Sequence, residues 1–138
     1  MRIPGWEDRL IAVIEAYRKR AFAWGQADCL LLASDAVKAV RGDDPAAPYR
    51  STYADERGAA RVLLSLNART APELLAHLFP GLPLAAAKRG DLAVIREPSA
   101  EDPFGAIGIV LGESVAGYGA DGLQFVSRLD CTRAFEVG

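Results

Sequence analysis

Apolar residues follow a helical period before about residue 90 and a strand-like period after it. In the first part, apolar residues recur every three to four positions in four stretches, which predicts four amphipathic helices. These stretches cover residues 5–20, 28–41, 55–67 and 70–79. After Gly90, short β-rich runs alternate with Gly, Pro, Asp and Ser, which predicts about five antiparallel strands. The runs are residues 91–97, 106–112, 114–120, 122–129 and 132–137.

Helices that precede strands, instead of alternating with them, indicate an α+β fold and argue against a parallel α/β sheet. No linker, internal repeat or low-complexity segment interrupts the 138 residues, so we expect one domain over residues 1–138. The helix over 28–41 is apolar almost all round, which is typical of a helix at the centre of a fold. Asp28 is suited to cap its start, and Gly42 is suited to end it.

Charge and composition narrow the range of functions. The formal net charge is −2, with 16 Lys and Arg scattered along the chain, so we expect neither nucleic acid nor an acidic membrane as a partner. No apolar run reaches the ~20 residues that a membrane span needs. The opening segment MRIPGWEDRLIAV contains acidic residues and lacks a secretory apolar core, so we expect no signal peptide.

The chain has two cysteines, Cys29 and Cys131, and one histidine, His77. Without an export signal, two thiols favour a reducing compartment, although a Cys29–Cys131 disulfide remains an alternative. No CxxC or HxxxH spacing occurs, so we expect no metal site and no cofactor. Any mechanism that pairs a cysteine with a histidine has to use His77.

Cys29 lies at the expected first turn of the helix over 28–41. The positive end of a helix dipole favours a thiolate there, and nearby backbone N–H groups are suited to stabilise an oxyanion. The charge of Asp28 acts in the opposite direction and raises the thiol pKa. Two interpretations follow from position alone: a nucleophile, or a small buried thiol of the kind common in protein cores.

The stretch FAWGQADC resembles the nucleophile region of NlpC-type cell-wall peptidases, which are papain-like cysteine peptidases. Phe22, Trp24, Gly25, Asp28 and Cys29 match that pattern in order. The later stretches RGDLAVI and AIGIVLG resemble the first two strands of the same family. The resemblance implies a papain-like fold in which the helix that begins at Cys29 packs on the sheet. The overall pattern is similar to a phage and prophage branch encoded near tail-assembly genes.

Several positions depart from the family pattern. The catalytic His that opens the second strand is replaced by Ala106, and the third polar residue has only Tyr118 or Asp121 as candidates. The substrate-contacting Tyr is Phe22, and the Ser after the nucleophile is Leu30. Because a thiol needs a base for activation and an acid for the leaving amine, these changes argue against peptidase activity. His77 is the one alternative base.

Three hypotheses follow. The first is an inactive NlpC-like domain with a structural, assembly or peptide- or glycan-binding role in a phage tail, located in the bacterial cytoplasm or the virion. Its partners would be phage tail proteins or peptidoglycan fragments. The second is an active cysteine peptidase or amidase that uses Cys29 with a non-standard base on peptidoglycan peptides. The third is an unrelated binding module in which Cys29 is merely buried. The expected groove-lining residues are Phe22, Trp24, Gly25, Asp28, Ala106 and Tyr118.

Overall fold

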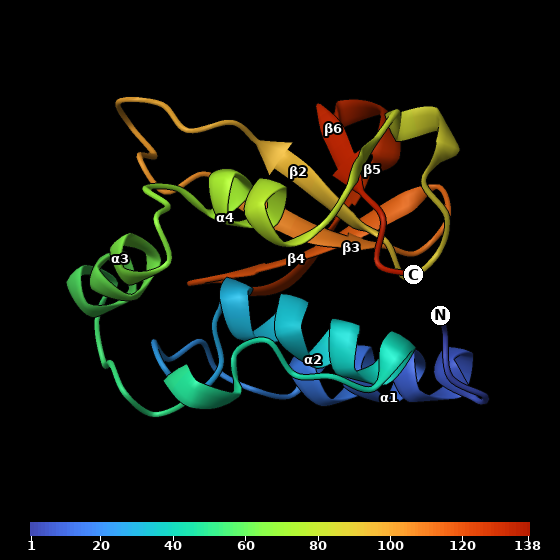
Figure 1. Ribbon diagram of the computed structural model, residues 1–138, viewed down its shortest axis with the longest axis horizontal. Helices are drawn as coiled ribbons and strands as arrows, with labels where there is room; N and C mark the ends of the chain where they lie inside the picture. Colours follow the sequence, from blue (N-terminus) through green and yellow to red (C-terminus); the bar gives the residue numbers. More distant parts are fainter.

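The computed structural model describes residues 1–138. In it, a layer of helices covers one face of an antiparallel sheet (Figure 1). The helices are α1 (Trp6–Arg18), α2 (Cys29–Arg41), α3 (Glu56–Ser65) and α4 (Ala71–Leu78). All four precede the long strands, so the predicted α+β organisation is confirmed. None of these helices combines the length and apolar character that a bilayer-spanning helix requires.

The sheet has six strands, whereas the sequence predicts about five. They are β1 (Gly81–Leu82), β2 (Leu92–Arg96), β3 (Ala106–Val110), β4 (Ser114–Gly119), β5 (Gly122–Ser127) and β6 (Arg133–Phe135). Their spatial order is β1-β6-β2-β3-β4-β5. The additional strand is β1, which has only two residues and therefore no alternation that a sequence pattern could reveal. It pairs with β6, which lies between β1 and β2.

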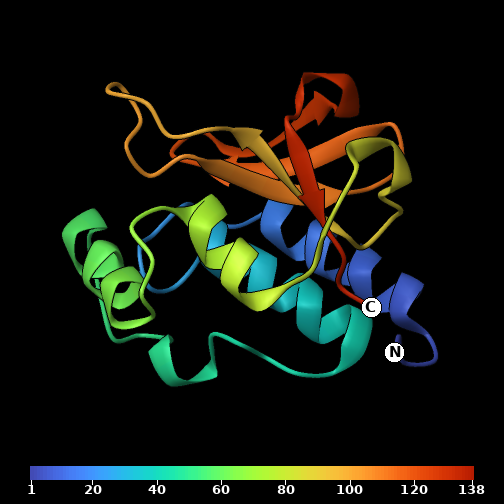
Figure 2. The same cartoon turned by 45° about the horizontal axis from the view of Figure 1, so that its top comes forward.

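The position of α2 explains its apolar composition. It lies in the middle of the helical layer, with α1 on one side and strands β3 and β4 above it (Figure 2). Eight of its 13 residues are buried, including Leu31, Val37 and Val40. Side chains from β2, β3 and β4 complete this core from the sheet. The helix that carries Cys29 is therefore fixed by the hydrophobic core on most of its surface.

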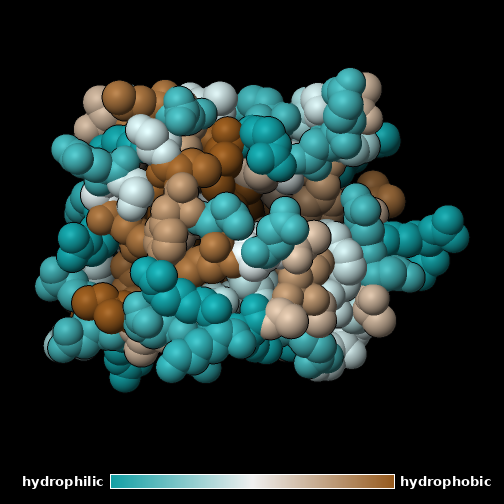
Figure 3. All heavy atoms as spheres, turned by 180° about the vertical axis from the view of Figure 1, so that it is seen from behind, coloured by the Kyte–Doolittle hydropathy of each residue, from teal (hydrophilic) through white to brown (hydrophobic).

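The other face of the sheet is covered only by short segments. A small apolar cluster there contains Ala93, Val110, Val115, Cys131 and Ala134. Cys131 thus belongs to a different cluster from the one that Cys29 packs against, and both cysteines are free. Seen from behind, the surface shows apolar patches separated by hydrophilic side chains (Figure 3).

A clamp of charged side chains holds the segment after α2 against that helix. The Arg50 guanidinium donates to Asp35 on α2 at 2.5 Å and to Asp44 at 2.9 Å. The Ser34 hydroxyl also donates to Asp44, at 2.6 Å. These contacts fix the loop that leads from α2 to Tyr53.

The clamp makes stability depend on acid pH. The hydrogen bond from Arg50 holds the pKa of Asp44 at about 2, below its usual 3.8. Because the pKa is lower in the folded state, this contribution is complete above about pH 4 and is lost as the pH falls toward 2. We expect Arg50→Met to lower stability above pH 4 and to approach the parent protein near pH 2. Urea unfolding from pH 2 to 5 measures this, with the exposed Arg61→Met as the control; parallel curves for Arg50→Met would contradict it.

Candidate functional site

The segment before α2 forms a tight turn that places Cys29 at the first helical position. Ala23 and Ala27 form an isolated antiparallel bridge, and Gly25 lies between them with a φ of +81°. A side chain at Gly25 would overlap the Tyr53 carbonyl oxygen, so only glycine fits this close approach. The turn therefore packs directly on the segment that precedes α3.

Asp28 is fully buried behind Cys29 and is held by three donors. Its carboxylate accepts from the backbone N–H groups of Gly25 and Leu31, both at 2.9 Å, and from the Tyr53 hydroxyl at 2.6 Å. The bond from Leu31 is the predicted N-cap of α2. These three bonds hold the turn, the start of α2 and the Tyr53 segment together, so Asp28 has a structural role in the site.

The surroundings of Cys29 stabilise the neutral thiol. Burial, followed by the charge of Asp28, raises the pKa of Cys29 to about 12. Backbone N–H groups at the start of α2 lower this pKa, but by less than burial and Asp28 raise it. The thiol is therefore predominantly protonated at neutral pH. Both effects expected from the sequence are present, since Asp28 raises this pKa and backbone N–H groups at the start of α2 lower it.

A pocket of about 520 Å³ opens beside Cys29 at one end of the sheet. It lies between the turn before α2, the start of α3, the segment from β2 to β3, and the β4–β5 hairpin. Its polar and charged lining residues are Glu56, Arg96, Asp102, Asp121 and Gln124. Its aromatic lining residues are Phe22, Trp24, Phe104 and Tyr118.

The aromatic rings of the pocket form a continuous chain. Phe22 meets Trp24 edge-on at 5.0 Å between ring centroids and Tyr118 at 5.7 Å, and Trp24 meets Phe104 at 5.7 Å. The Tyr118 hydroxyl donates to the Arg20 carbonyl oxygen at 2.6 Å. Tyr118, which the sequence offered as a third polar residue, thus uses its hydroxyl to anchor the segment after α1.

Charged residues of the pocket come from segments that are distant in the sequence. Arg96 donates to Asp102 at 2.9 Å across the connection between β2 and β3. The charge of Asp102 also contributes, as the weakest of the causes, to the raised pKa of Cys29. Glu56 begins α3 and Asp121 lies in the β4–β5 turn. Sequence reasoning missed Glu56, Arg96, Asp102 and Gln124; the charged stretch REPSAED was the one local signal.

Ala106 occupies the position at which the resemblance expects a histidine. It begins β3, pairs with Arg96 across an irregularity in β2, and contributes a methyl group to the pocket. No imidazole lines the pocket. The Ala106 methyl group can neither accept a proton from Cys29 nor donate one to a leaving group.

His77 lies outside the pocket. It is exposed in the last turn of α4, where its Nε2 is 2.8 Å from the Asn67 carbonyl oxygen and 3.8 Å from Glu73 Oε1. Leu74, Leu75 and Leu78 of the same helix line a separate apolar cavity of about 60 Å³ between α2, α3 and α4. The structure therefore brings Cys29 together with Ala106 and does not bring it together with His77.

The predicted groove residues divide into two groups. Phe22, Trp24, Ala106 and Tyr118 line the pocket with Cys29. Gly25 and Asp28 are buried behind it, because both are directed toward the Tyr53 segment. No set of three His, Cys, Asp or Glu side chains is arranged to hold a metal ion.

Comparison with known proteins places the whole domain in one family. A family model described as Domain of unknown function (DUF6950) matches residues 1–137, so the chain belongs to that family. The match includes the Cys29 turn, all four helices and all six strands. No curated protein and no solved structure gives a significant match.

Proposed function

We propose that this domain has an NlpC-type papain-like fold and binds a peptide or glycan segment in the pocket beside Cys29 without cleaving it. In this proposal the domain acts as a structural or assembly protein of a phage or prophage tail. The sequence resemblance to the phage branch supplies this setting. The α+β architecture, with the Cys-bearing helix against an antiparallel sheet, is consistent with it.

One observation carries the proposal: Cys29 faces a pocket that contains Ala106 in place of a base. Cleavage of an amide by a thiol requires a thiolate that attacks the carbonyl and an acid that protonates the leaving amine. Burial raises the pKa of Cys29 and so disfavours the thiolate, and the methyl group of Ala106 supplies no acid for the leaving amine. Peptidases instead lower the pKa of their catalytic thiol.

The pocket still has the properties of a binding site. Its volume of about 520 Å³ lies within the ~300–1,000 Å³ range of ligand pockets, and its lining mixes aromatic with polar side chains. Phe22 and Trp24 are partly exposed, so their rings can pack on the apolar faces of sugars and peptide groups. Carboxylates and an amide at the rim offer hydrogen bonds to hydroxyl and N–H groups.

Alkylation of Cys29 tests the loss of nucleophile activation. In a Cys131→Ser background, we expect iodoacetamide to react slowly at pH 7, with a rate that rises about tenfold per pH unit up to at least pH 10. Mass spectrometry of the labelled peptide follows the reaction, and the Cys29→Ser, Cys131→Ser double variant, which has no thiol, provides the unlabelled control. A fast rate that is independent of pH between 6 and 8 would reveal a thiolate and overturn the proposal.

A second measurement addresses binding and cleavage together. We expect purified peptidoglycan stem peptides or glycan fragments to shift the NMR signals of Trp24 and remain intact by mass spectrometry. Trp24→Ala should remove this binding, whereas the distant Trp6→Ala should not. Cleavage that disappears in Cys29→Ala would instead establish an active hydrolase with a non-standard base.

A further inference from the structure

The two edges of the sheet differ in a way that points to a binding surface. At one edge, β1 has two residues and is followed at once by Pro83, so it offers almost no backbone for pairing. At the other edge, β5 has six residues, GLQFVS, with no charge and no proline. It pairs with β4 on one side only. Natural proteins usually protect long edge strands with charges, prolines or bulges, and β5 has none of these.

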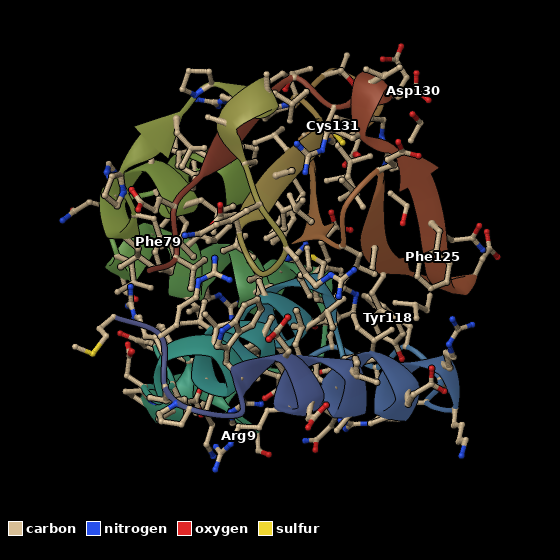
Figure 4. The ribbon with its side chains drawn as sticks, turned by 90° about the vertical axis from the view of Figure 1, so that its right-hand side faces the viewer. Arg9, Phe79, Tyr118, Phe125, Asp130 and Cys131 are labelled. Atoms are coloured by element: carbon tan, nitrogen blue, oxygen red, sulfur yellow. The ribbon has the colours of Figure 1, made fainter.

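The open side of β5 is visible in Figure 4, where no further segment lies beside the strand that carries Phe125. Phe125 is 43% exposed although it is a large apolar residue. It pairs with Ala116, a residue of the core below the sheet, so the Phe125 side chain lies on the helical side of the sheet. An added strand would cover both this ring and the unpaired backbone groups of β5.

A basic segment borders this edge on the same side. The Arg18 guanidinium lies 4.9 Å from the centroid of the Phe125 ring. The hydrogen bond from the Tyr118 hydroxyl to the Arg20 carbonyl oxygen holds the segment after α1 beside β4, the strand that pairs with β5. Arg18, Lys19 and Arg20 are consecutive; Glu15 pairs with Arg18 at 3.0 Å, and Arg20 donates to the Gln26 carbonyl oxygen at 2.9 Å. Of the nearby acids, Asp121 lies in the β4–β5 turn and Glu113 lies in the β3–β4 turn, where its carbonyl oxygen accepts from the Arg128 N–H just after β5.

We propose that the β5 edge binds an extended, acidic segment of a partner protein as a seventh strand. Backbone hydrogen bonds to β5 would supply the attachment, as in other cases of strand addition. Alternate carboxylates of the partner would lie on the helical side, next to Arg18 and the adjoining Lys19. A second copy of this chain fits less well, because a two-fold pairing of β5 would bring two identical basic segments together. The proposed site adjoins the Cys29 pocket, since Gln124 and Val126 of β5 also line that pocket, but it uses the open edge of β5 and does not depend on the function proposed for the pocket.

A seven-residue peptide of alternating Val and Glu serves as the probe, and the same peptide with Lys in place of Glu is its control. We expect the acidic peptide to bind by fluorescence anisotropy and to slow hydrogen exchange at the amides of residues 122–127. Binding should weaken as NaCl is raised from 50 to 300 mM, because the contacts are exposed to solvent. The Lys peptide should not bind.

Charge reversal at the basic segment provides the matched variants. Arg18→Glu together with Lys19→Glu should weaken binding of the acidic peptide roughly tenfold or more. Arg57→Glu together with Arg61→Glu on α3 makes the same change in charge at an exposed, distant helix and should leave binding unchanged. Circular dichroism establishes that both variants are folded.

Three results would overturn the proposal. The first is the absence of binding by the acidic peptide to the folded parent chain. The second is equal binding of the two peptides, or binding without slowed exchange in β5. The third is dimerisation of the chain itself with protected β5 amides and no peptide present, which would assign the edge to a second copy.

Discussion

Asp28→Ala is expected to lower the free energy of unfolding by about 4 kcal/mol. The change removes the N-cap of α2, at about 1 kcal/mol, and leaves the buried Tyr53 hydroxyl and Gly25 N–H without their partner, at about 1–3 kcal/mol each. For a domain of this size the loss corresponds to a fall of roughly 15 °C in the midpoint of thermal unfolding. Circular dichroism at 222 nm during heating measures it.

Asp55→Ala is the matched control for this prediction. Asp55 caps α3 with the same geometry, accepting from the Gly58 N–H at 2.7 Å, but it is exposed and has no second buried donor. Its replacement should cost only about 1 kcal/mol. Equal losses in the two variants would mean that Asp28 acts only as a cap and that its bonds to Tyr53 and Gly25 contribute little.

Gly25→Ala is expected to be similarly severe, with a loss of about 4 kcal/mol. The backbone at this residue has a φ of +81°, which costs a side chain about 1–2 kcal/mol. The new methyl group would also overlap the Tyr53 carbonyl oxygen, which belongs to the backbone and cannot move away alone. The turn and the Tyr53 segment would separate, so we also expect Cys29 to become more accessible to alkylation. Urea unfolding and the labelling rate measure the two effects.

Gly122→Ala separates backbone strain from overlap. Gly122 has a comparable φ of +87°, yet a side chain there meets no atom within 4 Å. It should therefore show only the backbone cost of about 1–2 kcal/mol. A Gly25→Ala variant no less stable than Gly122→Ala would show that the close approach to Tyr53 relaxes easily.

The helical layer could be predicted well because its signals are local. Apolar spacing located all four helices, and the capping residues Asp28 and Gly42 fixed both ends of α2. The four long strands after residue 90 and β6 were also found from their composition. The strand β1 was missed because two residues carry no period, and it exists only because β6 lies beside it. The order of the strands likewise depends on tertiary packing.

The candidate site was predictable only in part, for a similar reason. The position of Cys29 and four of its neighbours in the pocket were predicted from one short motif and from two strands, β3 with Ala106 and β4 with Tyr118. The hydrogen bond from Tyr53 to Asp28 joins residues 25 positions apart, so no local sequence pattern predicts it. Asp102 and Glu56 reach the pocket from a loop and a helix start whose placement is decided by the fold. The size of the effect of burial on the Cys29 thiol depends on the same packing.

The position of β6 has a consequence for biosynthesis. This strand, formed by residues 133–135, lies between β1 and β2 and contributes Phe135 to the core. Because β6 follows β2 to β5 in the sequence, the edge of β2 that it covers stays open until residues 133–135 join the sheet. During that interval β2 is an unprotected apolar edge strand, which is the kind of surface that chaperones bind and that aggregates grow from.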